Sequence, residues 1–191
     1  AGDAVEGVLD ALLHDAVAFA VEEKVDSLYY SKNKNPRFHY GKTFHHLYGK
    51  ETIEETLGQF RYGIGAGNFF QINPFGAEAI IGEVTKNLIG AETVVELYSG
   101  IGTITLAASR MAGQVIGNEI SEISVDYARQ TAEKNGVANV RYIAGPAEKM
   151  LPKIAEEETI DGLIVDPPRA GLDPVVVETL FESKPKQIIY V

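Results

Sequence analysis

The stretch from Val94 to Thr103 constrains the fold of this chain more than any other feature of the sequence. It opens with an apolar run of β type that contains one carboxylate, Glu96, and then breaks into the turn Gly100-Ile101-Gly102. An apolar stretch compatible with a helix follows at once. The pattern predicts a strand, a glycine loop and a helix, and the glycines would let the backbone approach a ligand closely.

The residues around this turn favour S-adenosylmethionine over a dinucleotide as the ligand. Thr105 stands where the dinucleotide fingerprint requires a third glycine. Glu96 would repel a pyrophosphate, whereas it suits a ligand that carries ammonium and sulfonium charges. A second strand-like run, 114–119, ends in Glu119, about where a ribose diol needs an acceptor. The alternative is an ordinary β-α-β turn in which Glu96 is only a solvated carboxylate.

Composition sets the broad class. The chain has 191 residues, of which 45% are hydrophobic and 23% charged, as expected for a globular protein with a real core. No apolar run approaches the roughly 20 residues of a membrane span, and no signal peptide is evident, so we expect a cytoplasmic protein that does not enter a membrane. The absence of cysteine excludes disulfides and thiolate metal sites in this chain, and the histidines lack metal-type spacing, so we expect no metal.

Charge is distributed unevenly. The net charge of −10 argues against a surface that binds nucleic acid as a whole. Between Ser27 and Lys50, however, five lysines and arginines occur with no Asp or Glu, interleaved with aromatic residues. The basic residues are Lys32, Lys34, Arg37, Lys42 and Lys50, and the aromatic ones are Tyr29, Tyr30, Phe38, Tyr40, Phe44 and Tyr48. Such a mixture can bind phosphates and stack on bases, but a solvated edge hairpin with a half-buried aromatic face is the simpler interpretation.

Periodicity predicts the organisation of the chain. Apolar spacing indicates a helix over 4–23 and another over 77–88, with short strands and hairpins between 38 and 72. Beyond residue 93 the predicted elements alternate: strands at 93–98, 114–119, 140–144, 161–166 and 187–191, and helices at 103–112, 122–136, 147–156 and 174–182. This alternation predicts an α/β fold with a doubly wound parallel sheet and right-handed crossovers. We therefore expect an N-terminal α+β region at 1–73 and a ligand-binding domain at 74–191.

The last predicted strand runs to Val191 without a cap or a polar tail. We therefore expect a sheet truncated after its fifth strand, in a chain that is a fragment. An open strand edge would promote self-association of this chain.

Three motifs in fixed order add a family resemblance. They are Phe69-Phe70-Gln71-Ile72-Asn73-Pro74, the loop from Glu96 to Gly102, and Asp166-Pro167-Pro168-Arg169-Ala170-Gly171-Leu172. Together they resemble the RNA uracil-C5 methyltransferase family, whose members modify uridine in transfer RNA and in large-subunit ribosomal RNA. The resemblance implies a Rossmann-like class I methyltransferase sheet, S-adenosylmethionine as the cofactor, and RNA as the partner, with ribosomal RNA as the first expectation and transfer RNA as the second.

The resemblance also implies roles for individual residues. Gln71 would contact the methyl donor, while Tyr98, Gly100 and Gly102 would surround its methionine part. Glu119 would accept its ribose hydroxyls, and Asp166 would face both the cofactor and the target base as the catalytic positioning residue. Ser99 and Thr103 stand where the family usually has Cys and often Asn, and both can still form hydrogen bonds. The expected cofactor set is Gln71, Glu96, Tyr98, Gly100, Gly102, Thr103, Glu119 and Asp166.

The largest departure from the family is the missing nucleophile. In the family, a Ser-Cys pair directly follows the strand that matches 188–191, and its thiolate adds to uracil C6 so that C5 can take the methyl group. We therefore expect this chain to bind the cofactor without catalysing transfer. Two alternatives stay open: a methylase of an exocyclic amine or small molecule, against which Arg169 after the two prolines counts, and a cofactor-binding domain without chemistry. An NAD-dependent dehydrogenase is a more distant alternative.

Overall fold

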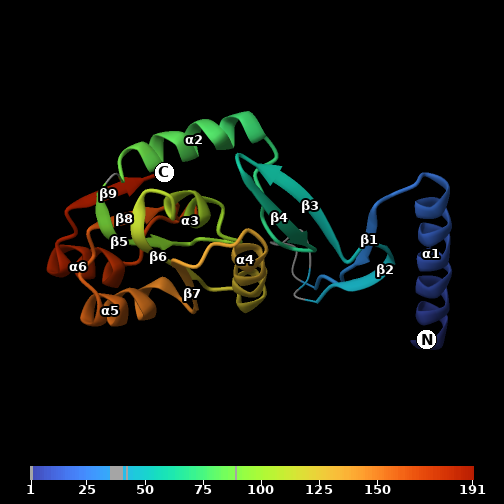
Figure 1. Cartoon of the computed structure of the whole chain (residues 1–191). Coiled ribbons are helices and arrows are strands. Elements are labelled where there is room, and N and C mark those ends of the chain that lie inside the picture. The colour runs from blue at the N-terminus through green and yellow to red at the C-terminus, as the bar shows by residue number, and fades with distance from the viewer. Residues whose placement is uncertain (1, 35–40, 42, 89) are drawn as a thin grey trace. The chain divides into compact units, whose positions relative to one another are not determined.

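The computed structural model describes residues 2–34, 41, 43–88 and 90–191 (Figure 1). They fall into two compact units that are interleaved in sequence. The N-terminal unit comprises Ala1–Glu54 and Ile64–Gly67, and the sheet unit comprises Glu55–Gly63 and Asn68–Val191. The domain boundary between 73 and 74 that the sequence suggests stays a prediction.

The described residues of the N-terminal unit include a helix and a pair of antiparallel strands. Helix α1 spans Gly2–Glu22, and strands β1 (Ser27–Tyr30) and β2 (His45–Gly49) pair with each other. Aromatic rings pair across these strands, with Tyr29 5.0 Å from His46 and Tyr30 5.7 Å from His45 between centroids. In the basic and aromatic segment, Arg37, Phe38, Tyr40 and Lys42 lie outside the described residues. An RNA-binding role for this segment stays a prediction.

The sheet unit is built on five parallel strands. They are β5 (Ala91–Leu97), β6 (Ala112–Glu119), β7 (Val140–Ala144), β8 (Gly162–Val165) and β9 (Gln187–Tyr190). Their order across the sheet is β7-β6-β5-β8-β9, and every neighbouring pair is parallel. The predicted doubly wound sheet is confirmed. The strand order reverses between β5 and β8, and in such sheets this switch point at the carboxyl ends is where ligands bind.

Alternation along the central strand β5 produces a core on each face of the sheet. Val95 and Leu97 pack into one buried cluster with Leu151 of helix α5 (Ala147–Glu157) and Val176 of helix α6 (Pro174–Ser183). Val94 packs into the other, which includes side chains of helices α2 (Pro74–Lys86) and α3 (Thr103–Ala108). Successive side chains of a strand point to opposite faces, so one apolar run supplies both clusters.

Helix α4 (Glu122–Lys134) also belongs to the sheet unit. Asn135, which follows its last turn, forms hydrogen bonds to the hairpin of β3 (Thr52–Leu57) and β4 (Phe60–Gly65). The Asn135 side chain accepts from the Arg61 N–H at 3.0 Å and donates to the Arg61 carbonyl at 2.7 Å. One side chain thus satisfies both backbone groups of a residue 74 positions away. The two bonds join β4 to the end of α4 within the sheet unit.

Helix α3 is shorter than predicted, ending at Ala108 instead of residue 112. Strand β6 has to begin at Ala112 because that residue pairs with Ala91 at the start of β5. The three residues between them form a turn, in which the Ser109 hydroxyl donates to the Leu106 carbonyl at 2.6 Å. Sheet register, which local periodicity does not reveal, therefore sets the end of this helix.

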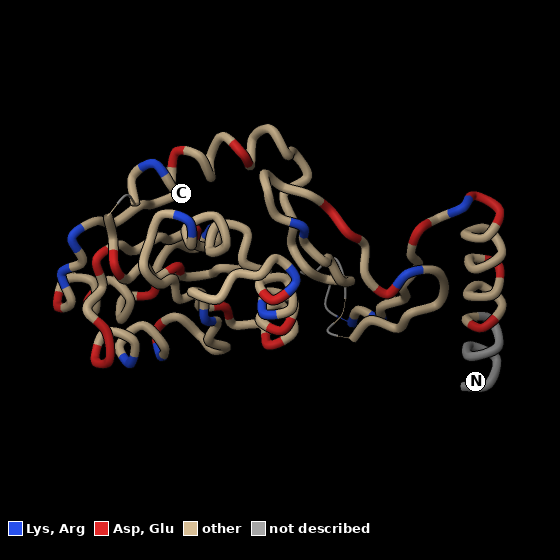
Figure 2. The backbone as a smooth tube through the Cα atoms, in the orientation of Figure 1, with Lys and Arg blue, Asp and Glu red and all other residues tan. Residues whose placement is uncertain are grey.

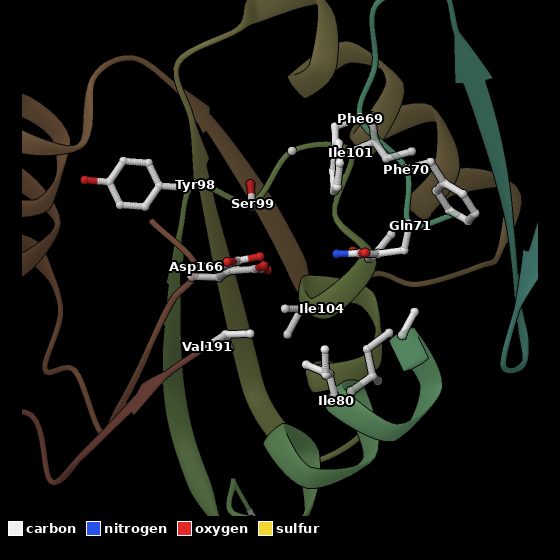
Figure 3. Close-up of a pocket in the computed structure, with 15 residues that line it drawn as sticks. Phe69, Phe70, Gln71, Ile80, Tyr98, Ser99, Ile101, Ile104, Asp166 and Val191 are labelled. Carbon is white, nitrogen blue, oxygen red and sulfur yellow. The ribbon is translucent and has the colours of Figure 1, made fainter. Parts of the chain in front are cut away.

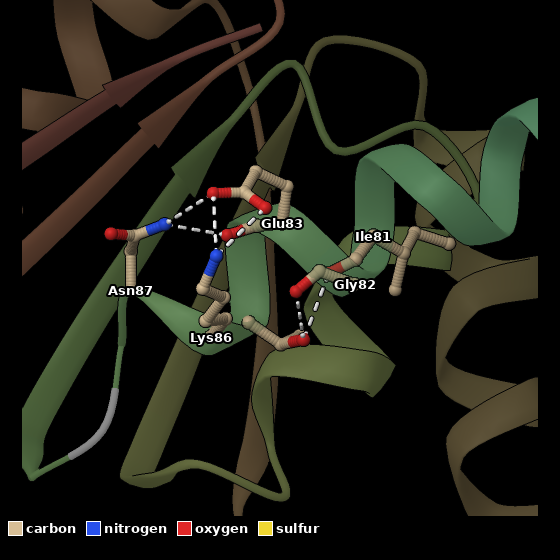
Figure 4. Close-up of polar contacts among 6 residues, drawn as sticks. Ile81, Gly82, Glu83, Lys86 and Asn87 are labelled. Carbon is tan, nitrogen blue, oxygen red and sulfur yellow. Dashed lines mark hydrogen bonds and ion pairs between the residues drawn. The ribbon is translucent and has the colours of Figure 1, made fainter.

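Both ends of helix α2 are fixed by local polar contacts. Asn73 caps the first turn by accepting from the Gly76 N–H at 3.1 Å, and Pro74 occupies the first helical position, where no donor is needed. At the other end Asn87 donates to the Glu83 carbonyl at 2.7 Å, and Lys86 pairs with the Glu83 carboxylate (Figure 4). These local contacts define the two ends of the helix.

The described part of the chain lacks two features that would change its functional class. It has no helix both long and apolar enough to cross a bilayer. Nor does any group of three or more His, Asp or Glu side chains in it have an arrangement that could hold a metal ion.

In Figure 2, Lys and Arg residues alternate with Asp and Glu along the sheet unit and are not gathered on one element.

Candidate functional site

A pocket of about 70 Å³ lies at the carboxyl ends of β5 and β8, inside the sheet unit (Figure 3). Its polar lining comes from Gln71, Glu96, Ser99, Thr103 and Asp166. Apolar lining comes from the segment before α2, from α2 and α3, and from the end of the chain: Phe69, Phe70, Ala77, Ile80, Ile81, Ile101, Ile104 and Val191. Ligand sites usually measure roughly 300–1,000 Å³, so the walls enclose only part of a nucleoside-sized ligand.

The loop after β5 has a backbone conformation that few residues adopt. Tyr98, Gly100 and Gly102 all have positive φ, at +64°, +56° and +84°. The loop is held by the Ser99 N–H, which donates to the Asn118 carbonyl of β6 at 3.0 Å, and by the Gly102 N–H, which donates to the Ser99 carbonyl at 2.8 Å. The two glycines adopt the left-handed backbone conformation at little steric cost, because they have no Cβ. Tyr98 adopts the same conformation although its Cβ makes it unfavourable.

The two glycines of the loop serve different purposes. Gly100 lines the pocket, and a Cβ added there would meet no atom within 4 Å. A Cβ added at Gly102 would instead lie 2.2 Å from the Tyr142 hydroxyl oxygen. Gly100 therefore leaves room on the ligand side, and Gly102 leaves room for a side chain of the protein itself. Only the first matches the expectation that glycines here permit a ligand to approach.

Tyr142 of β7 fills the space beneath this loop. Its side chain also lies against Gly117 of β6, where an added Cβ would be 2.7 Å from the ring. The residue is 6% exposed, so its ring and hydroxyl are almost completely shielded from solvent. Burial raises the pKa of Tyr142, so the hydroxyl stays neutral. Sequence reasoning missed this residue because a single tyrosine in a short strand carries no signal.

Glu96 is the most deeply buried acid of the site. It is 2% exposed, and its carboxyl accepts a hydrogen bond from the Thr105 hydroxyl of α3. Burial is the main cause that raises the pKa of Glu96 to about 8; the nearby acids Asp166 and Glu119 add to this effect, and the hydrogen bonds from Thr105 oppose it. The alternative of a merely solvated carboxylate is therefore wrong. Thr105, which replaces the third glycine of a dinucleotide fingerprint, instead supports this acid.

Glu119 lies at the end of β6 and is not part of the pocket wall. Its two carboxylate oxygens accept from the N–H groups of Gly100 at 3.1 Å and Ser121 at 2.9 Å. Each oxygen of a carboxylate can accept a second bond, so capacity for ligand hydroxyls remains. Glu119 also connects the glycine loop to the start of α4.

Gln71 and Asp166 approach the pocket from opposite sides. Figure 3 shows the Gln71 amide and the Asp166 carboxylate pointing into the same space. Asp166 directly follows β8, and partial burial raises its pKa. Val191 lies beside Asp166 in the wall, and its N–H donates to the Val165 carbonyl at 2.9 Å. The chain thus reaches the pocket again immediately after β9.

The structure brings six of the eight expected cofactor residues to the pocket wall: Gln71, Glu96, Tyr98, Gly100, Thr103 and Asp166. Gly102 and Glu119 lie outside the wall. The Tyr98 ring points away from Gln71 and Asp166 (Figure 3) and packs against the core cluster near α5 and α6. The role expected for its side chain, around the methionine part, stays a prediction. The apolar lining from α2 was not expected, because periodicity shows that a helix has an apolar side but not what that side faces.

Comparison with known proteins gives a consistent result. A family model described as tRNA (uracil-5-)-methyltransferase matches residues 42–191. Relatives described as uncharacterized RNA methyltransferases, from Listeria monocytogenes and Halalkalibacterium halodurans, are 43% and 39% identical over 148 residues. Each match covers 76% of this chain and 32% of the relative, so the chain spans about a third of the length of these relatives.

One solved structure has both sequence and fold similarity. It is the Pyrococcus abyssi tRNA (uracil-54, C5)-methyltransferase in complex with S-adenosyl-L-homocysteine, with a TM-score of 0.68 and 32% identity. The match covers 86% of this chain and 40% of that protein.

Proposed function

Because this chain belongs to the tRNA (uracil-5-)-methyltransferase family, we propose that it forms the S-adenosylmethionine-binding part of an enzyme that methylates C5 of uridine in RNA. The observation that carries the proposal is the pocket at the switch point of the sheet. Its wall includes Glu96, Asp166, Gln71 and Gly100, and a Cβ added at Gly100 would meet no protein atom within 4 Å. The complex of the P. abyssi relative with S-adenosyl-L-homocysteine supports the choice of ligand.

The residues present suit such a ligand chemically. Gly100 leaves space on the pocket side, and the carboxyl groups of Glu96 and Asp166 provide negative charge for an ammonium and a sulfonium. Glu119 retains acceptor capacity for ribose hydroxyls, and the Gln71 amide can both donate and accept. When bound, S-adenosylmethionine supplies a methyl group on a positively charged sulfur. The protein's part is to hold that sulfur and the target base in a fixed relation.

Covalent catalysis on uracil needs a nucleophile that this chain does not contain. The chain has no cysteine, and in the family the thiolate follows the strand that matches β9. Val191 in the pocket wall supports this arrangement, since residues that follow it would start at the site. Asp166 would then position the base between cofactor and thiolate. Its role, like those of Gln71, Glu96, Tyr98, Gly100, Gly102, Thr103 and Glu119, is part of the proposal.

Calorimetric titration of the chain with S-adenosylmethionine tests the proposal, with NAD as the competing ligand. We expect binding of S-adenosylmethionine and of S-adenosylhomocysteine but not of NAD. Asp166→Asn should weaken the binding, and the exposed control Glu156→Gln should leave it unchanged. Binding of NAD in place of S-adenosylmethionine would contradict the proposal.

A methyl-transfer assay separates the proposal from an amine methylase. Labelled cofactor is incubated with transcripts of a transfer RNA and of large-subunit ribosomal RNA, the two substrate classes that we propose. The chain should transfer no methyl group to either, because uracil C5 is unreactive without a thiolate. Efficient transfer by the chain would favour methylation of an exocyclic amine, which needs no covalent intermediate.

Self-association is a further part of the proposal. Strand β9 is an edge strand of the sheet, and Ile188 and Tyr190 on it are 50% and 63% exposed. An open, apolar strand edge is a common site of association between chains. Light scattering over a range of concentrations should detect dimers or larger species, and a strictly monomeric chain would refute this part.

A further inference from the structure

Three carboxylic acids converge on a site without a basic side chain. Glu96 and Asp166 line the pocket, and Glu119 holds its glycine loop through the Gly100 N–H. None of the described residues in the pocket wall is a lysine or an arginine. Like charges that share a desolvated site cannot all be ionised at low cost, so at least one of these acids has to hold a proton when no cation is bound.

Glu96 is the acid that its surroundings keep protonated. Asp166 and Glu119 face it from the ends of β8 and β6, and the phenols Tyr62 and Tyr142 face it from β4 and β7. Its carboxyl also accepts hydrogen bonds from Thr105 of α3, one of them from the hydroxyl. Its 2% exposure and its pKa of about 8 favour the protonated form of Glu96 at neutral pH.

We propose that Glu96 is a specificity-determining group of the cofactor site. Its carboxyl gives up a proton to solvent when a ligand with a sulfonium group binds. The site thereby distinguishes the methyl donor from its product, in which the sulfur is a neutral thioether. The inference rests on the proposed function. In this step the carboxyl O–H bond breaks, the proton passes to the buffer, and the carboxylate stays next to the bound cation. No other bond changes.

The physical reason is electrostatic. A positive charge within about 4–6 Å of a carboxyl group favours its ionised form. S-adenosylmethionine carries a sulfonium and an ammonium, whereas S-adenosylhomocysteine has lost the sulfonium charge together with the methyl group. The donor should therefore expel the proton more completely than the product does. The pocket then favours the reactant most strongly when Glu96 can ionise.

Affinity for the donor should consequently depend on pH. Since binding releases a proton, affinity rises with pH between the pKa of Glu96 in the complex and its pKa of about 8 in the free protein. The steepest possible rise is about tenfold per pH unit, which corresponds to one proton. Above that window the contribution of Glu96 to the affinity should level off. The ratio of donor to product affinity should increase over the same window.

Isothermal titration calorimetry measures the released proton directly. The full chain is titrated with each ligand at pH 6.8 in buffers of low and high ionisation enthalpy, such as phosphate and Tris. At this pH the ligand's own ammonium remains charged, because α-amino groups have pKa values of about 7.7–8.0. We expect release of up to about one proton with S-adenosylmethionine and clearly less with S-adenosylhomocysteine.

Three variants assign the proton to its source. Glu96→Gln keeps the shape and an acceptor for Thr105 but cannot ionise, so proton release should fall to near zero. Asp166→Asn removes the other acid of the pocket wall and should leave most of the release intact. Glu156→Gln, an exposed acid of α5, should match the parent chain.

The result that would overturn the inference is a binding heat for S-adenosylmethionine that does not depend on the buffer. Release that persists in Glu96→Gln, or disappears in Asp166→Asn, would overturn it as well. In all of these cases the ligand still binds, so the proposed function would stand. The dependence of the binding heat on the buffer is measured with the parent chain, so this part of the test stays valid even if a variant does not fold. Absence of binding by either ligand would instead refute the proposed function, and this inference with it.

Discussion

Replacing Gly102 with alanine should destabilise the sheet unit much more than the same replacement at Gly100, two residues away. Both glycines have positive φ, at +84° and +56°, so alanine at either position has to adopt the left-handed conformation. That conformation costs roughly 1–2 kcal/mol per residue. Alanine also restricts the unfolded chain, which returns roughly 0.4–1 kcal/mol. For Gly100→Ala we expect a net loss of about 1 kcal/mol of folding free energy, because the space around it is open.

Gly102→Ala adds a steric conflict. Its new Cβ would lie 2.2 Å from the hydroxyl oxygen of Tyr142 and 2.8 Å from the ring carbon that bears it. Overpacking a well-packed interior costs typically 1–3 kcal/mol, so the total loss should be about 2–4 kcal/mol. Tyr142→Phe removes the nearer of the two atoms. In the Gly102→Ala background it should recover part of the loss, though not all of it.

Urea denaturation of Gly100→Ala and of the four proteins of the double-mutant cycle at positions 102 and 142 measures the effect as a free energy of unfolding. Calorimetry with S-adenosylmethionine on the folded variants gives the second readout. Gly100→Ala should reduce ligand affinity more than it reduces stability, because the new methyl group enters the ligand side. Equal stability losses at the two glycines, or no coupling between positions 102 and 142, would refute the interpretation that Gly102 accommodates Tyr142.

Three further substitutions test other parts of the structure. Asn135→Ala should lower the free energy of unfolding by about 1–2 kcal/mol, because it leaves both backbone groups of Arg61 without their partner; urea denaturation measures this. The pKa of Asp161 is lowered by Lys186, whose ammonium lies 2.6 Å from the carboxylate, and by the N–H groups of Thr93 and Glu92. The stabilising effect of Asp161 is therefore present at neutral pH and is lost as the pH falls below the ordinary aspartate pKa of about 3.9. Asp161→Asn should therefore flatten the acid limb of a plot of stability against pH, and an unchanged limb would contradict this assignment. Glu119→Ala should cost about 1–3 kcal/mol of affinity for S-adenosylmethionine, and unchanged calorimetric titration would remove Glu119 from the cofactor site.

The fold and the loop beside the candidate pocket could be predicted because the relevant signals are local. Alternating apolar runs and helical spacing predicted all five strands of the parallel sheet. The turn Gly100-Ile101-Gly102 predicted where the ligand loop lies, since left-handed backbone between a strand and a helix calls for glycine. The motif that contains Gln71 predicted a contribution from the segment before α2, and its amide does point into the pocket. Each of these signals depends on neighbours within a few residues.

The electrostatic character of the site was decided only by the tertiary structure. From the sequence, Glu96 could have been a solvated carboxylate or a ligand contact. Its burial, its bond to Thr105 and the convergence of Asp166 and Glu119 depend on how β5, β6, β8 and α3 pack. The same packing places Tyr142 beneath Gly102, which assigns the second glycine to the protein interior. Backbone conformation follows from local residue types, whereas burial and pKa depend on distant residues that only the folded chain brings together.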